Sequence, residues 1–207
     1  MRRPERTFLS AEQCRMLIDG TREDPMHAFY VLALSTGMRE AEMLGLTWAA
    51  VDFERRTVSV TDTLQRVDGE WKLLPPKTER SRRTIDIPEP TVAALRAHRS
   101  AQRKARAAVG QLGPDGLVFT TPTGRPIHGS NLLPPFRATL ARLGLPRITI
   151  HDLRHSAATW LFALGVPLPV IADRLGHSTI RVTADLYRHR VPALSRDASD
   201  RLGEAMA

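Results

Sequence analysis

The sequence predicts a mainly α-helical protein with a small three-stranded antiparallel β-sheet on one edge. Helix-start signals recur along the chain, and the hydrophobic period changes from helical spacing to alternation after Val51. Asp68-Gly69 lies between short apolar runs in that region, which is a strong signal for a hairpin. The chain has 207 residues, of which 42% are hydrophobic and 25% charged, so it can form a domain with a sizeable core.

Local signals define three helices before Val51. Ser10 followed by Gln13 predicts a capping box at the start of the first helix. A second helix begins near Pro25, and Gly37 suits the position after its end, where a left-handed backbone is common. Arg39 begins a third, short helix.

The predicted sheet has three strands, and their residues alternate or form short apolar runs. These strands are Thr57–Val60, Trp71–Leu74 and Thr84–Ile87. Asp68-Gly69 is expected to turn the chain between the first and the second strand. The stretch 75–81 is expected to form the turn before the third.

The second half of the chain is predicted to be helical, apart from a brief extended piece at 117–119. Thr149, with Asp152 three residues later, is expected to cap one of these helices. A last helix begins at Pro192, and its apolar residues form a narrow stripe at spacing four. The helices expected before it are Pro90–Ala108, Ser130–Leu143, Thr149–Ala163, Pro167–Leu175 and Ser178–Tyr187, and the stripe consists of Leu194, Ala198, Leu202 and Met206.

Charge and cysteine content narrow the class of protein. A formal net charge of +8 favours a polyanionic partner such as nucleic acid. Cys14 is the only cysteine, which excludes an intrachain disulfide and a thiolate metal cluster and fits a reducing compartment. The first residues lack the apolar segment of a signal peptide, and no apolar run approaches the roughly 20 residues that span a bilayer. We therefore expect a soluble, cytoplasmic protein without a membrane partner.

Two arginines, Arg39 and Arg154, suit the cleavage of a phosphodiester without metal. A guanidinium stays protonated and can donate two hydrogen bonds to the oxygens of an anionic phosphate. His151 precedes Arg154 by three residues, so both are expected on one face of a helix, near backbone N–H groups that favour an anion. Taken alone, this histidine–arginine pair also fits a solvated helix face.

Tyr187 is the candidate nucleophile. A phenol has an ordinary pKa near about 10, so it needs help to attack a phosphate at neutral pH. His177 lies in a Gly-His-Ser turn that should lead into the helix of Tyr187, and it can donate to a phosphate oxygen or move a proton. The alternative is that His177 caps this helix and Tyr187 packs in the core.

The leaving oxygen needs a proton, and Lys77 is the candidate general acid. It lies on the expected turn before the third strand, among basic residues, where it could also be an ordinary solvated lysine. Glu42 follows Arg39 by about one helical turn and can fix its guanidinium, although an exposed ion pair is an alternative.

Four blocks of sequence resemble the motifs of the tyrosine recombinases, also called the phage integrase family, in the order and spacing of that family. They are Thr36–Leu46, Pro76–Ile85, His151–Thr159 and Leu175–His189. The resemblance implies the fold of the recombinase catalytic domain. It also implies catalytic roles for six residues and no cofactor, neither metal nor ATP. The six are Arg39, Lys77, His151, Arg154, His177 and Tyr187.

The resemblance implies a reaction and its partners. Tyr187 would attack a scissile phosphate to give a 3′-phosphotyrosyl link and a free 5′-hydroxyl, and a 5′-hydroxyl of a partner strand would reverse the step. The expected partners are double-stranded DNA attachment sites, on which four protomers join two duplexes, with a monomer free in solution. Glu42 and Asp152 are expected to support the catalytic groups, and Arg80, Arg82 and Arg83 to contact the DNA backbone.

The expected organisation has three parts. Residues 1–8 resemble a linker, residues 9–190 form the catalytic domain, and residues 191–207 form a C-terminal helix that docks on a neighbouring protomer or on its own domain. Full-length integrases of this kind usually carry further DNA-binding domains before the catalytic domain, so we expect the chain to be a catalytic fragment, with an unusually short natural member as the alternative.

Two other functions remain compatible with parts of the sequence. Gly165–Val182 resembles a helix-turn-helix, which would suit a DNA-binding regulator without catalysis. A type IB topoisomerase uses a related tyrosine site but relaxes supercoils without strand exchange. The regulator would leave Arg39, Lys77 and the pair of His151 and Arg154 without a role. Relaxation without strand exchange between two defined sites would favour the topoisomerase over an integrase of a phage or other mobile element.

Overall fold

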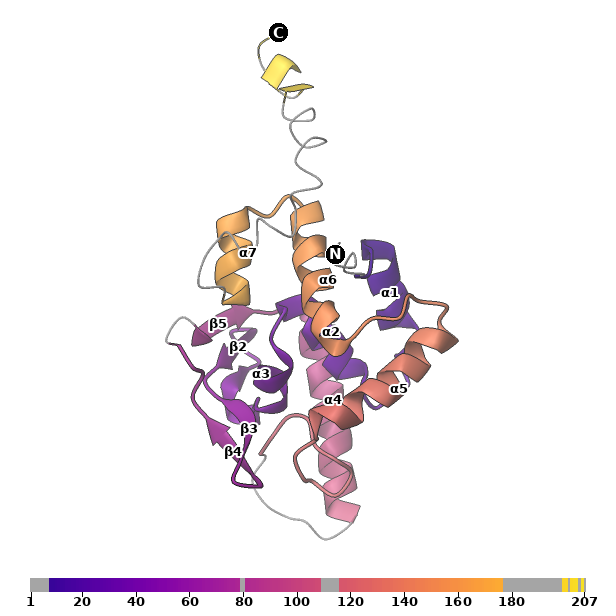
Figure 1. Ribbon diagram of the computed structural model, residues 1–207, viewed down its shortest axis with the longest axis vertical. Helices are drawn as coiled ribbons and strands as arrows, with labels where there is room; N and C mark the ends of the chain where they lie inside the picture. Colours follow the sequence, from indigo (N-terminus) through magenta and orange to yellow (C-terminus); the bar gives the residue numbers. More distant parts are fainter. Residues whose placement is uncertain are drawn as a thin grey trace, which may run out of the picture.

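Helices make up most of the structure, and the strands lie together on one side of it (Figure 1). The computed structural model describes residues 8–78, 81–108, 116–176, 199–200, 202–204 and 206. Its helices are α1 (Ala11–Asp19), α2 (His27–Thr36), α3 (Glu40–Leu44), α4 (Glu89–Ala108), α5 (Gly129–Arg142), α6 (Ile150–Ala163) and α7 (Leu168–Leu175), with a 3₁₀ turn η1 (Trp48–Ala50). The predicted fold class, mainly helical with a small antiparallel sheet, is confirmed. None of the described helices is both long and apolar enough to span a membrane.

The strands form a three-stranded sheet and a separate hairpin, all antiparallel. The sheet has the order β1 (Val51–Asp52), β2 (Thr57–Val60) and β5 (Arg83–Asp86), and the hairpin consists of β3 (Thr63–Val67) and β4 (Glu70–Leu74). The predicted turn at Asp68-Gly69 is confirmed, and both residues have positive φ, 52° and 83°, as a tight hairpin turn requires.

The predicted membership of the sheet was wrong. Residues 71–74 do not join the strand at Thr57–Val60. They pair with Thr63–Val67, so that Leu64 faces Leu73, and Val51–Asp52 supplies the third strand of the sheet. A two-residue turn can join only the strands that directly flank it, and the segment before Asp68 lacks the alternation that marks a strand in the sequence.

Helix α2 is the centre of the core. Its residues 28–34 are all buried, and it packs against α1, α4 and α6. Phe29 meets Phe119 edge to face at 5.1 Å, and Tyr30 lies 5.4 Å from Phe136. A helix that is hydrophobic on all sides must be covered on all sides. The helix ends at Gly37, whose φ of 64° confirms the predicted left-handed position.

Local capping fixes the starts of α1 and α6 as predicted. Ser10 and Gln13 form a reciprocal capping box at α1. At α6, the carboxylate of Asp152 accepts hydrogen bonds from the backbone N–H and the hydroxyl of Thr149, at 2.8 and 2.7 Å. This capping places His151 and Arg154 in the first turns of α6.

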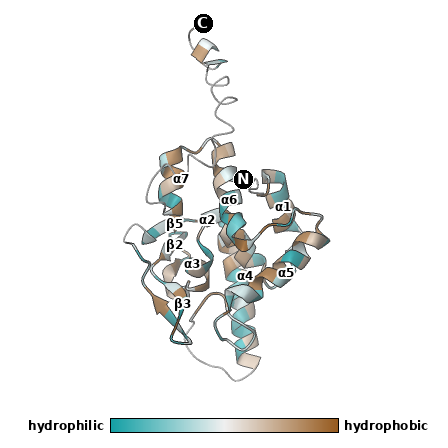
Figure 2. Cartoon of the chain, in the orientation of Figure 1, coloured by the Kyte–Doolittle hydropathy of each residue, from teal (hydrophilic) through white to brown (hydrophobic). Residues whose placement is uncertain are grey.

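Helix α4 contains both hydrophobic and hydrophilic residues (Figure 2), and it buries Thr91, Val92, Ala94 and Leu95. Its half-buried His98 lies between the rings of Trp48 and Phe119, and its Nε2–H donates to the carbonyl of Val118 at 2.8 Å. Burial lowers the pKa of His98 below its ordinary value, and the hydrogen bond to Val118 opposes this only in part. The folded protein therefore favours the neutral imidazole.

We predict that acid weakens the fold through His98. The unfolded imidazole binds a proton near 6.5, above the lowered pKa of the folded state, so the free energy of unfolding falls as the pH drops below that value. Denaturant titrations at pH 7 and pH 5 should show that the free energy of unfolding falls less for His98→Gln than for the native chain. Some loss should remain, because burial also lowers the pKa of His27. An equal loss in both proteins would contradict the assignment to His98.

Candidate active site

One cavity of about 420 Å³ brings together two residues that the sequence predicted to act together. Arg39 comes from the start of α3, and Lys77 from the loop after β4, where its side chain is exposed. Gly176, at the end of α7, also lines the cavity. The remaining lining residues are Ala41, Glu42, Thr63, Gln65, Thr78 and Ser81.

Glu42 orients Arg39 at the edge of this cavity. Its buried carboxylate accepts a hydrogen bond from the backbone N–H of Arg39 at 2.8 Å and another from its Nη1 at 2.7 Å. Nη2 of Arg39 donates to the carbonyl of Gly176 at 3.1 Å. The side chain of Arg39 is still 38% exposed, whereas that of Glu42 is 1% exposed. The guanidinium of Arg39 is therefore fixed by Glu42 and Gly176, while its exposed part remains accessible from the cavity.

The expectation that Arg83 contacts DNA does not fit its position. Its side chain is 7% exposed, and its guanidinium donates to both carboxylate oxygens of Glu42, at 2.9 and 3.2 Å. Strand alternation could have revealed this, because Arg83 lies two residues before the buried Ile85 and so faces the same side of β5. Arg82, by contrast, is exposed.

Glu42 is charged between two guanidinium groups. Burial alone would raise the pKa of its carboxyl, but hydrogen bonds and charge from Arg83, with further hydrogen bonds from Arg39, bring the pKa below its ordinary value. The expected contact between Glu42 and Arg39 is thus present, as a buried pair shared with a second arginine rather than as an exposed one.

Arg154 is buried, and its guanidinium bridges two helix ends. Nη1 donates to the carbonyl of Gly37 at 2.6 Å, and Nη2 to the carbonyl of Leu175 at 2.7 Å. Burial, together with the nearby charges of Arg39 and Arg83, lowers the pKa of Arg154 to about 9, although Glu42 opposes this shift. The guanidinium of Arg154 is still protonated at neutral pH. The carbonyl of Leu175 that it contacts directly precedes the carbonyl of Gly176 that Arg39 contacts.

His151 and Arg154 do not share one environment as expected. His151 is exposed, with its ring 5.1 Å from that of His155, and it is not among the described residues that line the cavity. Positions three apart on a helix differ by about 60° in direction, so one can face solvent while the other faces the core. Asp152 contacts Thr149, and so it supports the start of α6.

Three predicted site residues, His177, Tyr187 and Arg80, lie outside the described residues, as does the predicted helix Ser178–Tyr187. Of the predicted C-terminal stripe, Leu202 and Met206 are described, and both are exposed. Within the part of the chain that the structure describes, no three His, Cys, Asp or Glu side chains are grouped to hold a metal ion.

Sequence reasoning missed Arg174. Its Nη2 donates to the carbonyls of Ser35 and Asp86, both at 2.7 Å, which ties α7 to the end of α2 and to β5. Burial lowers its pKa, the carboxyl of Asp86 opposes this, and Arg83 adds to the lowering. A basic residue in the last turn of a helix is a common capping signal, although it does not reveal which carbonyls are contacted.

Comparisons with known proteins were made for the sequence and for the fold. The model of the phage integrase family matches residues 7–193. The chain is 34% identical over 208 residues to a protein named tyrosine recombinase XerC-like, from Caldanaerobacter subterraneus, with 94% of this chain and 53% of that protein covered. It is 27% identical to the ICEBs1 integrase of Bacillus subtilis, with 99% and 56% covered.

Solved structures share the fold. The Tn1549 transposon integrase in complex with transposon right end DNA superposes with a TM-score of 0.83 at 23% identity, over 98% of this chain and 68% of that one. The XerA recombinase gives a TM-score of 0.71 at 21% identity, over 90% and 61%. The chain spans about half the length of the relatives it matches by sequence.

Proposed function

Because this chain belongs to the phage integrase family, we propose that it carries the catalytic part of a site-specific DNA recombinase that integrates or excises a phage or other mobile element. The observation that carries the proposal is the cavity that Arg39, Lys77 and Gly176 line. Arg39 donates a hydrogen bond to the carbonyl of Gly176, and Arg154 donates one to the carbonyl of the preceding residue, Leu175. Positively charged groups from distant parts of the sequence thus lie where a phosphate can enter.

The proposed reaction is a pair of balanced transesterifications. The phenolic oxygen of Tyr187 attacks the phosphorus and loses its proton, with His177 assisting, while the bond from phosphorus to the 5′ oxygen breaks. Lys77 gives a proton to the departing oxygen, which becomes a 5′-hydroxyl. The 5′-hydroxyl of another strand then attacks the 3′-phosphotyrosyl link and releases Tyr187. Because each step exchanges one phosphoester for another, ATP is not required, and the cationic side chains supply the charge stabilisation that a metal ion would otherwise give.

The charge that builds up on the phosphate oxygens is offset by Arg39, Arg154, His151 and His177. Arg39 presents its exposed edge to the cavity. The guanidinium of Arg154 has more N–H donors than its two carbonyl bonds use, so it can also donate toward a phosphate. Donors fixed in advance stabilise a transition state because they need no rearrangement during the reaction. The role of His151 follows from the family motif.

Arg154→Lys is predicted to slow strand cleavage by about 100-fold. A single ammonium cannot span the carbonyls of Gly37 and Leu175 and also donate to a phosphate as a planar fork does. The rate of covalent adduct formation would be measured at saturating protein. The assay temperature would be well below the thermal unfolding midpoint of the variant. A folded variant that cleaves within about threefold of the native rate would contradict the assignment.

Double-stranded DNA is the proposed partner, held through its backbone by Arg80 and the exposed Arg82. We also propose that four protomers assemble on two duplexes in the cytoplasm, with the C-terminal helix docking on a neighbour. Two features support this docking. Leu202 and Met206 are 61% and 78% exposed, and a cavity of about 1010 Å³ with a largely apolar lining lies between α2, α4 and α6. Its apolar lining includes Val31, Leu34, Ala94, Trp160, Leu161 and Leu164.

A nicked duplex that carries the attachment site tests the proposed function. The short strand beyond the cleavage point diffuses away, so the phosphotyrosyl intermediate cannot be resealed and accumulates. With EDTA present, a denaturing gel is expected to show a protein–DNA adduct of reduced mobility. No adduct on the cognate duplex would overturn the proposal. Relaxation of supercoiled DNA without exchange between two sites would indicate a topoisomerase instead.

A further inference from the structure

Three arginines from three different elements contact the end of helix α7. The carbonyl of residue 174 accepts a hydrogen bond from Arg83 at 2.7 Å, and that of residue 175 accepts one from Arg154 at 2.7 Å. The carbonyl of residue 176 accepts one from Arg39 at 3.1 Å. The last carbonyls of a helix have no partner within the helix, and they carry the negative end of its dipole. Cationic donors are therefore well suited to this position, which directly precedes His177.

Arg83 differs from Arg39, which lines the cavity, and from Arg154, whose printed hydrogen bonds go to carbonyls rather than to Glu42. It is not among the described residues that line the cavity, and its side chain is almost fully buried. One edge of its guanidinium holds both oxygens of Glu42, and its Nε–H holds the carbonyl of Arg174. Glu42 in turn holds Arg39. Arg83 thus connects the backbone before His177 to the carboxylate that orients Arg39.

We propose that Arg83 is a positioning residue for strand cleavage, which rests on the function proposed above. It sets the distance between the guanidinium of Arg39 and the 174–176 backbone that leads to His177. It acts through Glu42 and the end of α7 and does not touch DNA. A planar guanidinium suits this task because its donors keep fixed relative directions, which the flexible ammonium of lysine cannot do.

Arg83→Lys is the informative variant because it should fold. Lysine keeps a positive charge beside the buried Glu42, so no uncompensated charge is left in the core. Helix α7 also stays anchored by Arg154 and by the two carbonyl bonds of Arg174. What lysine loses is the simultaneous contact with both oxygens of Glu42 and with the carbonyl of Arg174.

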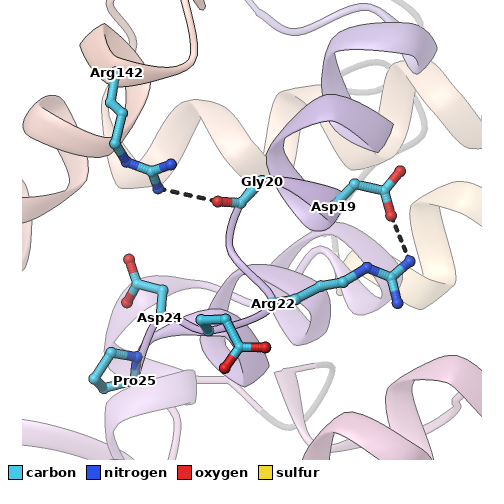
Figure 3. A pocket seen from close by; sticks show the side chains of 7 residues that line it. Asp19, Gly20, Arg22, Asp24, Pro25 and Arg142 are labelled. Carbon is cyan, nitrogen blue, oxygen red and sulfur yellow. Dashed lines mark hydrogen bonds and ion pairs between the residues drawn. The ribbon is translucent and has the colours of Figure 1, made fainter.

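Arg142→Lys is a matched control. Arg142 also caps a helix end, since its Nη2 donates to the carbonyl of Gly20 at 3.0 Å after α1 (Figure 3). It lines a different cavity, together with acidic residues at 19, 23 and 24 (Figure 3). The same substitution there changes a capping arginine without changing Glu42 or the end of α7.

The test measures adduct formation on the nicked cognate duplex for the native protein and both variants. Arg83→Lys is expected to lower the rate at saturating protein by at least about tenfold, because small displacements of reacting groups are costly. The protein concentration for half-saturation of the DNA should stay within about threefold, and Arg142→Lys should match the native protein in both quantities. Weaker DNA binding with an unchanged cleavage rate would overturn the proposal, because Arg83 would then be a DNA contact.

Hydrogen exchange measured by mass spectrometry gives a second readout that needs no activity. Peptides covering 168–176 should lose protection in Arg83→Lys, while peptides from α4 should not. Equal loss in all helices would show a general stability role and overturn the proposal, as would unchanged exchange. If the native protein forms no adduct, the proposed function fails, and the exchange comparison still decides whether Arg83 orders the end of α7.

Discussion

Tyr187→Phe is expected to abolish the covalent protein–DNA adduct, whereas Tyr30→Phe should leave it unchanged. These two residues are the only tyrosines in the chain, so the pair tests every phenol that the protein has. Removing the attacking oxygen leaves no atom to form the phosphotyrosyl bond. The native protein and both variants would be incubated with the nicked cognate duplex in EDTA and compared on a denaturing gel.

Tyr30 is a sound control because the fold keeps it from DNA. Its side chain is buried in α2 against Phe136, and burial together with Asp24 raises the pKa of its phenol to about 12. Loss of its hydroxyl should cost about 1 kcal/mol of stability or less. An adduct that persists in Tyr187→Phe would contradict the proposed mechanism, and so would one that disappears in Tyr30→Phe while that variant stays folded.

Glu42→Ala is expected to lower the free energy of unfolding by about 3–5 kcal/mol. The substitution removes the only carboxylate that contacts Arg83 among the described residues, and it leaves that buried guanidinium uncompensated, close to Arg39 and Arg154. Denaturant unfolding followed by circular dichroism would measure the loss.

Glu40→Ala is the matched control for Glu42→Ala. Glu40 lies in the same short helix, but burial raises the pKa of its carboxyl, opposed by His128, so its charged form is not stabilised in the same way. Its loss should cost about 1 kcal/mol or less. Equal costs for the two variants would contradict the role given to Glu42.

The pH dependence of unfolding adds a second check on Glu42. The pKa of its carboxyl is lower in the folded state than its ordinary value of 4.5, so its contribution is present above that value and is lost as the pH falls through the folded pKa. Glu42→Ala should lack this part of the acid destabilisation.

The elements that the sequence predicted well are those fixed by neighbouring residues. The capping boxes at Ser10 and Thr149 and the left-handed Gly37 each involve groups only a few positions apart. Their donors and acceptors can be read from the sequence without knowing the rest of the fold.

The pairing of the strands could not be read in that way. Thr63–Val67 has no clean alternation, since its first two residues are buried and the next three are not, so nothing marked it as a strand. The partners Val58 and Ile85 of β2 and β5 are 27 positions apart, and only the packed core selects that pairing.

The burial and the hydrogen-bond partners of the arginines also could not be predicted from the local sequence. Arg82 and Arg83 are adjacent and both look like surface cations, but the carboxylate that holds Arg83 is 41 positions away. Arg154 is likewise buried by carbonyls from the ends of two other helices. The motifs could name these residues, whereas their burial and partners depend on the tertiary structure.

The contacts at the end of α7 also bear on the order of folding. They join positions 91 and 137 residues apart, and closing such long loops is slow because much chain entropy is lost before any contact is made. A chain still emerging from the ribosome can form α2 or the β3–β4 hairpin early, but it cannot gather these cations until α7 has been synthesised. Under the proposed function, incomplete chains therefore lack the cluster of cations that strand cleavage would need.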